Sequence, residues 1–225
     1  MAKKGEHSGD GIRQAATESV RQGEGVRERV RDLTLGALTS RRFDREAIRE
    51  VVRAVTEGVS LGAEGSGAGT RQSVAEAFRG MDQALAKSVQ AGQEAIRQLV
   101  DTGRGVSERE LQQALAGLQK IEEDFVATVG QVAESASERV RPDLREALGQ
   151  ATRAGTETSR QVAATMTELT RTFAGASVGF TLAGIEVASE FGARFAQIAG
   201  GVLAGMADAL DKPPAEVRAE AKKSS

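Results

Sequence analysis

Apolar residues recur along this chain at alternating steps of four and three, the spacing that puts them on one face of a helix. A chain built from such seams is predicted to be all-α, with long amphipathic helices that form an antiparallel hairpin or bundle, or a coiled-coil-like oligomer. The clearest seam is Val74, Phe78, Met81, Leu85, Val89, Gly92, Ile96 and Leu99. A second seam follows a capping box at Ser107 and Glu110 and includes four predicted helix-packing residues, Leu111, Leu115, Leu118 and Phe125.

Composition limits how thick a core these helices can build. The chain has no Trp, Tyr or Cys, only seven Phe and three Pro, and much of its apolar content is Ala and Val. Small side chains favour close helix packing over a thick globular centre, and the scarcity of proline favours helix. The formal net charge is −2 with both signs interspersed, so we expect no nucleic-acid partner. The absence of cysteine fits a reducing compartment, and a polar N-terminus without a signal sequence favours the cytoplasm.

Changes in composition mark the boundaries along the chain. The glycine-rich stretch GVSLGAEGSGAG carries a large ordering cost with few side chains to offset it, so it reads as a flexible linker. The helix that precedes this linker should begin near Asp44, which can cap it, and end at Gly58. Pro142 should either kink its helix or start the next one. We predict a disordered tail at 1–11, an N-terminal helical pair at 12–57, the linker at 58–69, a long helical hairpin or bundle at 70–172, an apolar amphipathic helix at 173–210 and a polar tail at 211–225.

The segment 173–210 is the most informative part of the sequence. It contains four of the seven Phe, no Lys, and charge only at Glu186, Glu190, Arg194 and Asp208. Its uncharged runs are shorter than the roughly 20 residues needed to cross a bilayer, so we expect it to lie on a surface or in a packed assembly. The predicted surface- or partner-binding face is Phe173, Phe180, Val187, Phe191, Phe195, Ile198 and Val202. Small residues at spacing four, Gly175 with Gly179 and Gly201 with Gly205, are predicted helix-packing positions.

Chemistry-bearing motifs are weak. Residues 175–179 match G-x-S-x-G, but that motif needs a strand-to-helix elbow and a histidine base, and the only histidine is His7 in the predicted tail. The carboxylates at 122–124 lack the Glu-x-x-His partner of metal-binding bundles. We therefore predict no enzymatic activity, no cofactor, no metal and no small-molecule substrate.

Two stretches carry a resemblance. GMDQALAKSVQAGQEAIRQ (80–98) and VSERELQQALAGLQKIEEDFVATV (106–129) resemble an uncharacterised family of helical bacterial proteins, over about the middle half of the chain. That resemblance implies no established activity. In overall character, with no Cys or Trp, Ala/Gln/Glu-rich helices and a polar tail after an apolar helix, the chain also resembles phasins, which coat polyhydroxyalkanoate granules. The glycine content and the apolar C-terminal helix depart from the usual phasin pattern.

Two functions follow as hypotheses. The first is a cytoplasmic, self-associating helical protein that binds a hydrophobic surface, such as a storage granule or membrane interface, through the 173–210 helix. The alternative is an oligomeric scaffold or protein-interaction module in which that helix is buried inside the assembly.

Overall fold

The computed structural model describes residues 8–66, 70–101, 108–175 and 187–211, with only the backbone at 108–111, 170, 172–175, 187–192 and 211. Every regular element in these ranges is a helix, which confirms the all-α prediction. The helices are α2 (Gly9–Gln22), α3 (Val26–Thr39), α4 (Arg45–Glu64), α5 (Thr70–Asp101), α6 (Glu108–Ser135), α7 (Arg141–Ala154), α8 (Glu157–Gly175) and α9 (Val187–Asp211).

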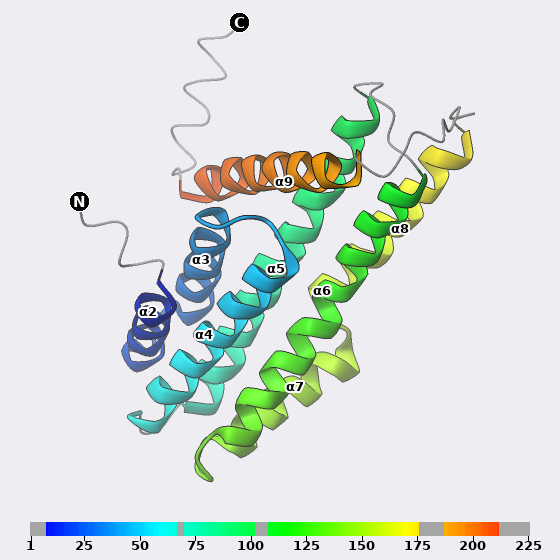
Figure 1. Cartoon of the computed structure of the whole chain (residues 1–225). Helices are drawn as coiled ribbons and strands as arrows, with labels where there is room; N and C mark the ends of the chain where they lie inside the picture. Colours follow the sequence, from blue (N-terminus) through cyan, green and yellow to red (C-terminus); the bar gives the residue numbers. More distant parts are fainter. Residues whose placement is uncertain (1–7, 67–69, 102–107, 176–186, 212–225) are drawn as a thin grey trace, which may run out of the picture.

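Helix α5 is the centre of the arrangement. Helices α3, α7, α8 and α9 all pack on it, while α2 packs on α4 and α4 on α6. Figure 1 shows α5 and α6 running in opposite directions, with α7 and α8 returning along α6. Helix α9 lies across the direction of these long helices rather than along it (Figure 1). The chain therefore forms a bundle with one transverse helix.

The N-terminal half contains one helix more than the predicted pair. Gly23 and Gly25 have φ values of 75° and 55°, a left-handed conformation that glycine adopts without steric cost. They divide the single helix predicted after Ile12 into α2 and α3. The predicted disordered tail is also too long, because Ser8 caps α2 by accepting a hydrogen bond from the Gly11 N–H at 3.1 Å. Asp44 caps α4 as predicted, by accepting from the Ala47 N–H at 2.9 Å.

The predicted flexible linker is wrong for residues 58–64, which form the last part of α4. Gly58 and Gly62 face α2 at very short range. A Cβ at Gly62 would lie 2.7 Å from the Thr17 carbonyl oxygen, and one at Gly58 would lie 2.7 Å from the Ala16 Cβ and closer still to a backbone carbonyl. The Thr17 hydroxyl also donates to the Gly58 carbonyl at 3.0 Å. These glycines are present because two helix backbones meet there; residues 67–69 lie outside the described ranges.

Most of the described residues between 70 and 172 are helical, with a break at Gly155 that the sequence did not indicate. Pro142 lies in the first turn of α7 and so starts a helix rather than kinking one. Gly155, with φ 74°, ends α7. This part of the predicted hairpin segment therefore consists of two helices, α7 and α8. The predicted capping box lies outside the described side chains.

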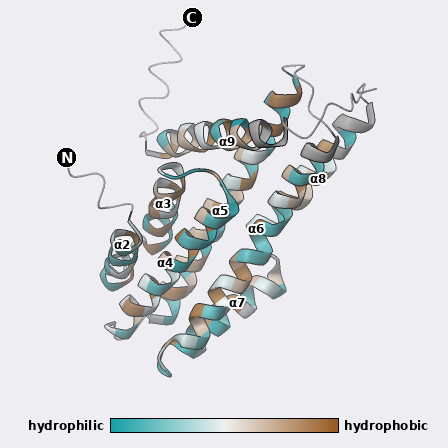
Figure 2. Ribbon diagram, in the orientation of Figure 1, coloured by the Kyte–Doolittle hydropathy of each residue, from teal (hydrophilic) through white to brown (hydrophobic). Residues whose placement is uncertain are grey.

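The hydrophobic core is thin and continuous. The seam of α5 is its axis: Val74, Phe78, Met81, Leu85, Val89 and Ile96 are all at most 3% exposed. Figure 2 shows hydrophobic and hydrophilic residues alternating in bands along the helices, as expected for amphipathic helices. Buried hydroxyls at Thr34, Thr56 and Ser88 donate to the carbonyl four residues earlier, at 2.6, 2.7 and 3.0 Å, so they add no unpaired polar group to the core.

Candidate functional site at the seat of helix α9

Helix α9 is held against the bundle mainly by small residues. Ala196, Ala199 and Leu203 are buried, and α9 as a whole packs mainly on α5 and α3. The ring of Phe195 meets the ring of Phe43 edge-on, with centroids 6.0 Å apart and planes at 72°. Phe43 precedes the N-cap of α4, so this ring pair joins α9 to the turn between α3 and α4.

The contact that holds α9 buries little large apolar surface. Full burial of a Leu side chain contributes about 1.5–3 kcal/mol, and each methyl-sized group about 0.8 kcal/mol. Leu203 is the one large side chain of α9 that is fully buried among the described residues. By contrast, α5 is fixed by an entire seam of buried Val, Phe, Met, Leu and Ile. Detachment of α9 therefore costs less than detachment of a central helix.

The structure brings only part of the predicted binding face together. Phe195, Ile198 and Val202 are half-buried on α9 and pack at the edge of the core. Val187 and Phe191 are also in α9, but their side chains are outside the described set. The single predicted helix over 173–210 is wrong at its start, because Phe173 belongs to α8. Phe180 lies outside the described residues.

The glycines that let helices approach closely are different from the predicted ones. A Cβ at Gly201 or Gly205 would meet nothing within 4 Å, so no described helix of the same chain packs closely against them. Their role as packing positions stays a prediction. Gly175 and Gly179 are not described in this respect. Close approach occurs instead at Gly58 and Gly62, already described, at Gly80 against the α3 backbone, and at Gly92, where a Cβ would lie 2.5 Å from Leu118 Cδ2. Gly58 and Gly62 have the same spacing of four as the predicted pairs, so this spacing could have identified them as packing positions.

The predicted packing residues of α6 lie at different depths. Leu118 and Phe125 are buried, Phe125 with its ring 6.0 Å from that of Phe78 on α5. Leu115 is half-buried, and Leu111 has no described side chain. Leu118 thus packs where Gly92 leaves room for it, which explains why α5 carries a glycine within its apolar seam.

A cavity of about 440 Å³ opens beside the α9 seat. It lies between the α3–α4 turn, α6 and α9, and sequence reasoning gave no signal for it because its walls come from three distant segments. Its apolar lining is Phe43, Ile48, Ala114, Leu118, Ile121, Phe195 and Ala196, and its polar lining is Arg42, Asp44, Arg45 and Gln113.

The ion pair Arg45–Asp124 crosses from α4 to α6 beside this cavity. Arg45 donates from Nη2 to Oδ1 at 2.7 Å and from Nε to Oδ2. These hydrogen bonds lower the pKa of the Asp124 carboxyl, because they stabilise its charged form, and they raise the pKa of Arg45. In the same way Arg27 of α3 donates to Glu76 of α5 at 2.6 Å, which lowers the pKa of Glu76. Two pairs of helices are therefore joined by carboxylates that must be ionised.

These pKa shifts predict an acid limb in stability. Both carboxyls have folded-state pKa values below their unfolded ones, so their contribution is complete above about pH 5 and is lost as pH falls below about 4. We expect the thermal midpoint, measured by circular dichroism, to be constant from neutral pH to about 5 and then to fall. The double variant Glu76→Gln, Asp124→Asn should fall less steeply, whereas Glu138→Gln, at an exposed position, should follow the unmodified protein. Parallel curves for the double variant and the unmodified protein would contradict this account.

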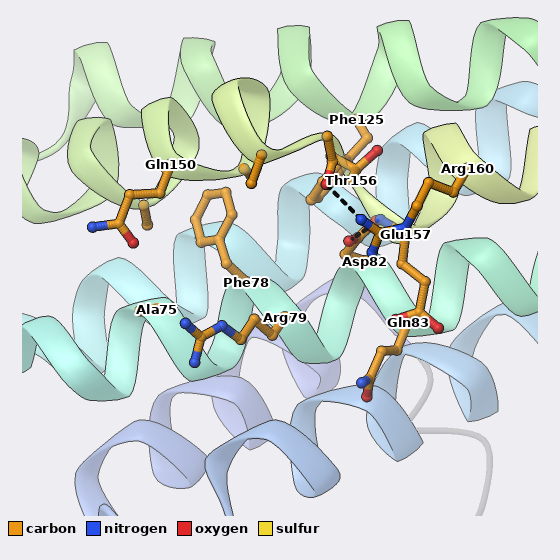
Figure 3. A pocket seen from close by; sticks show the side chains of 14 residues that line it. Ala75, Phe78, Arg79, Asp82, Gln83, Phe125, Gln150, Thr156, Glu157 and Arg160 are labelled. Carbon is orange, nitrogen blue, oxygen red and sulfur yellow. Dashed lines mark hydrogen bonds between the residues drawn. The ribbon is translucent and has the colours of Figure 1, made fainter.

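A second cavity, of about 350 Å³, lies between α5, α7 and α8 (Figure 3). Figure 3 shows Asp82 of α5 reaching the first turn of α8, where its carboxylate accepts from the Glu157 N–H at 2.6 Å and the Thr158 N–H at 2.9 Å. Arg79 on the wall is engaged with Glu76 at 2.6 Å. Arg160 donates to the Gly155 carbonyl at 3.4 Å. Asp82 therefore joins α5 to α8, while Arg79 is paired within α5 itself.

No group of three or more His, Cys, Asp or Glu side chains is arranged to hold a metal ion among the residues that the structure describes. In the same part of the chain, every helix is too short or too polar to cross a membrane.

Fold and site together define a helical bundle whose most apolar helix is docked across it. The chain belongs to a family of unknown function (DUF6781), whose model matches residues 1–212. The family match thus confirms the resemblance to an uncharacterised family and extends it from the middle half to nearly the whole chain. No curated protein and no solved structure matches the chain.

Proposed function

We propose that this protein is a non-enzymatic helical protein that binds a hydrophobic surface, such as a membrane interface or a storage granule, through α9. The observation that carries the proposal is the light docking of α9. Among its described side chains, those that are buried apolar groups are two alanines and one leucine, while Phe195, Ile198 and Val202 are partly buried at the edge of the core. A helix held in this way can exchange its contact with the bundle for a contact with an apolar surface.

The chemistry of α9 supports an interfacial position. Its four charged residues, Glu190, Arg194, Asp208 and Asp211, are spread over a helix that is otherwise small and apolar. Such a helix gains free energy by burying its apolar face at an interface while its polar side stays in water. On the other side of α9, Arg194, Gln197 and Asp208 are exposed, which gives the helix the two-faced character that this position needs.

The test is co-sedimentation of the full chain with phosphatidylcholine vesicles and, separately, with polyhydroxyalkanoate particles. We expect binding to at least one surface, and we expect the double variant Phe191→Asp, Ile198→Asp to lose it, because both positions share one side of α9 at about 100° per residue. The matched control is Ala193→Asp, Gln197→Asp, which adds the same charge at two exposed positions and should still bind.

Three outcomes are informative. Loss of binding in the Phe191/Ile198 variant alone, with helix content unchanged by circular dichroism, supports the proposal. Equal binding by both variants would place the contact elsewhere and overturn it. A stable oligomer that ignores both surfaces would overturn it in favour of the scaffold alternative.

A further inference from the structure

The cavity beside α9 has the properties of a ligand site rather than of a packing defect. Its volume of about 440 Å³ falls within the roughly 300–1,000 Å³ usual for sites that hold small molecules. The cavity opens to solvent at its polar side, where Arg42, Asp44, Arg45 and Gln113 are exposed. Its walls combine an apolar lining with a few polar groups at one side, as such sites generally do.

The apolar walls come from buried side chains that are fixed in place. Leu118 and Ile121 of α6, Ile48 of α4 and Phe43 are each at most 6% exposed. Phe195 of α9 also lines the cavity and is in ring contact with Phe43. The part of a ligand that fits here is expected to be hydrocarbon, because the side chains of this part of the lining are all apolar.

The polar side of the cavity favours an anion. Arg45 is neutralised by Asp124, and Asp44 is engaged at the N-terminus of α4, where it accepts from the Ala47 N–H. Arg42 is exposed, and none of the ion pairs among described residues involves it. Arg42 is thus the cation of this lining that is left without a carboxylate partner in the described part of the chain. Gln113 supplies a neutral amide.

We propose that this cavity binds one molecule of a single-chain anionic amphiphile, a fatty-acid-like ligand. Its alkyl chain lies among Ile48, Leu118, Ile121 and Phe195, and its carboxylate or other anionic head lies at Arg42. The site goes beyond the surface-binding function and does not depend on it, because the cavity belongs to the arrangement in which α9 is docked. An occupied cavity would hold Phe195 in place and so favour docked α9.

Gly117 provides a clean way to block the cavity. It lies on α6 within the lining, and a Cβ added there meets nothing within 4 Å. A larger side chain at this position therefore enters empty space, and the change from glycine also favours the helix by about 1 kcal/mol. Gly117→Leu should consequently fold at least as well as the unmodified protein while filling the site.

The experiment is calorimetric titration of the full chain with decanoate below its micelle concentration, with decanol as the uncharged comparison. We expect saturable decanoate binding that Gly117→Leu weakens by about tenfold or more, while Gly117→Ala keeps most of it. Arg42→Gln should weaken decanoate binding by about threefold to tenfold and leave decanol binding unchanged. Vesicle binding of the unmodified protein is measured separately and without decanoate, so failure here and failure of the surface proposal can be told apart.

Several results would overturn the inference. Absence of saturable binding by either probe would do so. Equal decanoate affinity in Gly117→Leu, with its fold verified by circular dichroism, would mean that the alkyl chain partitions elsewhere. An equal loss of decanoate and decanol binding in Arg42→Gln would remove the anionic part of the assignment.

Discussion

Gly58→Ala is expected to lower the free energy of unfolding by about 1–3 kcal/mol, the usual cost of overpacking. The new methyl group would lie 2.7 Å from the Ala16 Cβ and closer still to the Arg13 carbonyl oxygen. Because a backbone carbonyl cannot move aside alone, α2 and α4 must separate. The measurement is urea denaturation followed by circular dichroism, with the midpoint compared at constant slope.

The matched control for this prediction is Gly201→Ala on α9. Gly201 is also helical, but a Cβ there meets nothing within 4 Å. Alanine is the better helix former by about 1 kcal/mol, so this variant should be slightly more stable than the unmodified protein. An increase in the free energy of unfolding of Gly58→Ala, like that expected for Gly201→Ala, would contradict the close contact of α4 with α2.

Asp82→Ala is the second change with a large expected effect, a loss of about 1–2 kcal/mol. The Asp82 carboxylate of α5 accepts from the N–H groups of Glu157 and Thr158 at 2.6 and 2.9 Å, and its Oδ1 lies 2.7 Å from the Thr158 hydroxyl. Thr158 is fully buried, so its amide is left without that acceptor. The negative charge also interacts favourably with the N-terminus of α8.

Hydrogen exchange distinguishes this role from a general loss of stability. In Asp82→Ala, the amides at the first turn of α8 should lose protection more than those of α5 or α6. Asp82→Asn should lose less, because its amide oxygen still accepts one hydrogen bond. A uniform decrease across all helices, or no decrease at Thr158, would contradict the assignment of Asp82 as an inter-helix cap.

Local signals in the sequence were sufficient to predict a helix, or one of its ends, wherever the residues that specify it lie within the helix itself. The seam from Val74 to Leu99 predicted α5 because its positions all lie on one helix face, and the structure buries them. Asp44 could be recognised as a cap because its partner is only three residues away. Pro142 was restricted to a kink or a helix start by its missing N–H, and the structure shows the start.

Glycine and Phe195 show what only tertiary structure decided. A glycine in sequence signals conformational freedom, so Gly58 and Gly62 suggested a linker; the approach of α2 made them packing residues. Phe195 was recognised as needing cover, yet its partner Phe43 lies more than a hundred residues earlier. The cap from Asp82 to α8 and the cavity lined by three segments have the same origin. Helix formation depends on neighbours within one turn, which the sequence displays, whereas helix contacts depend on which faces meet in space.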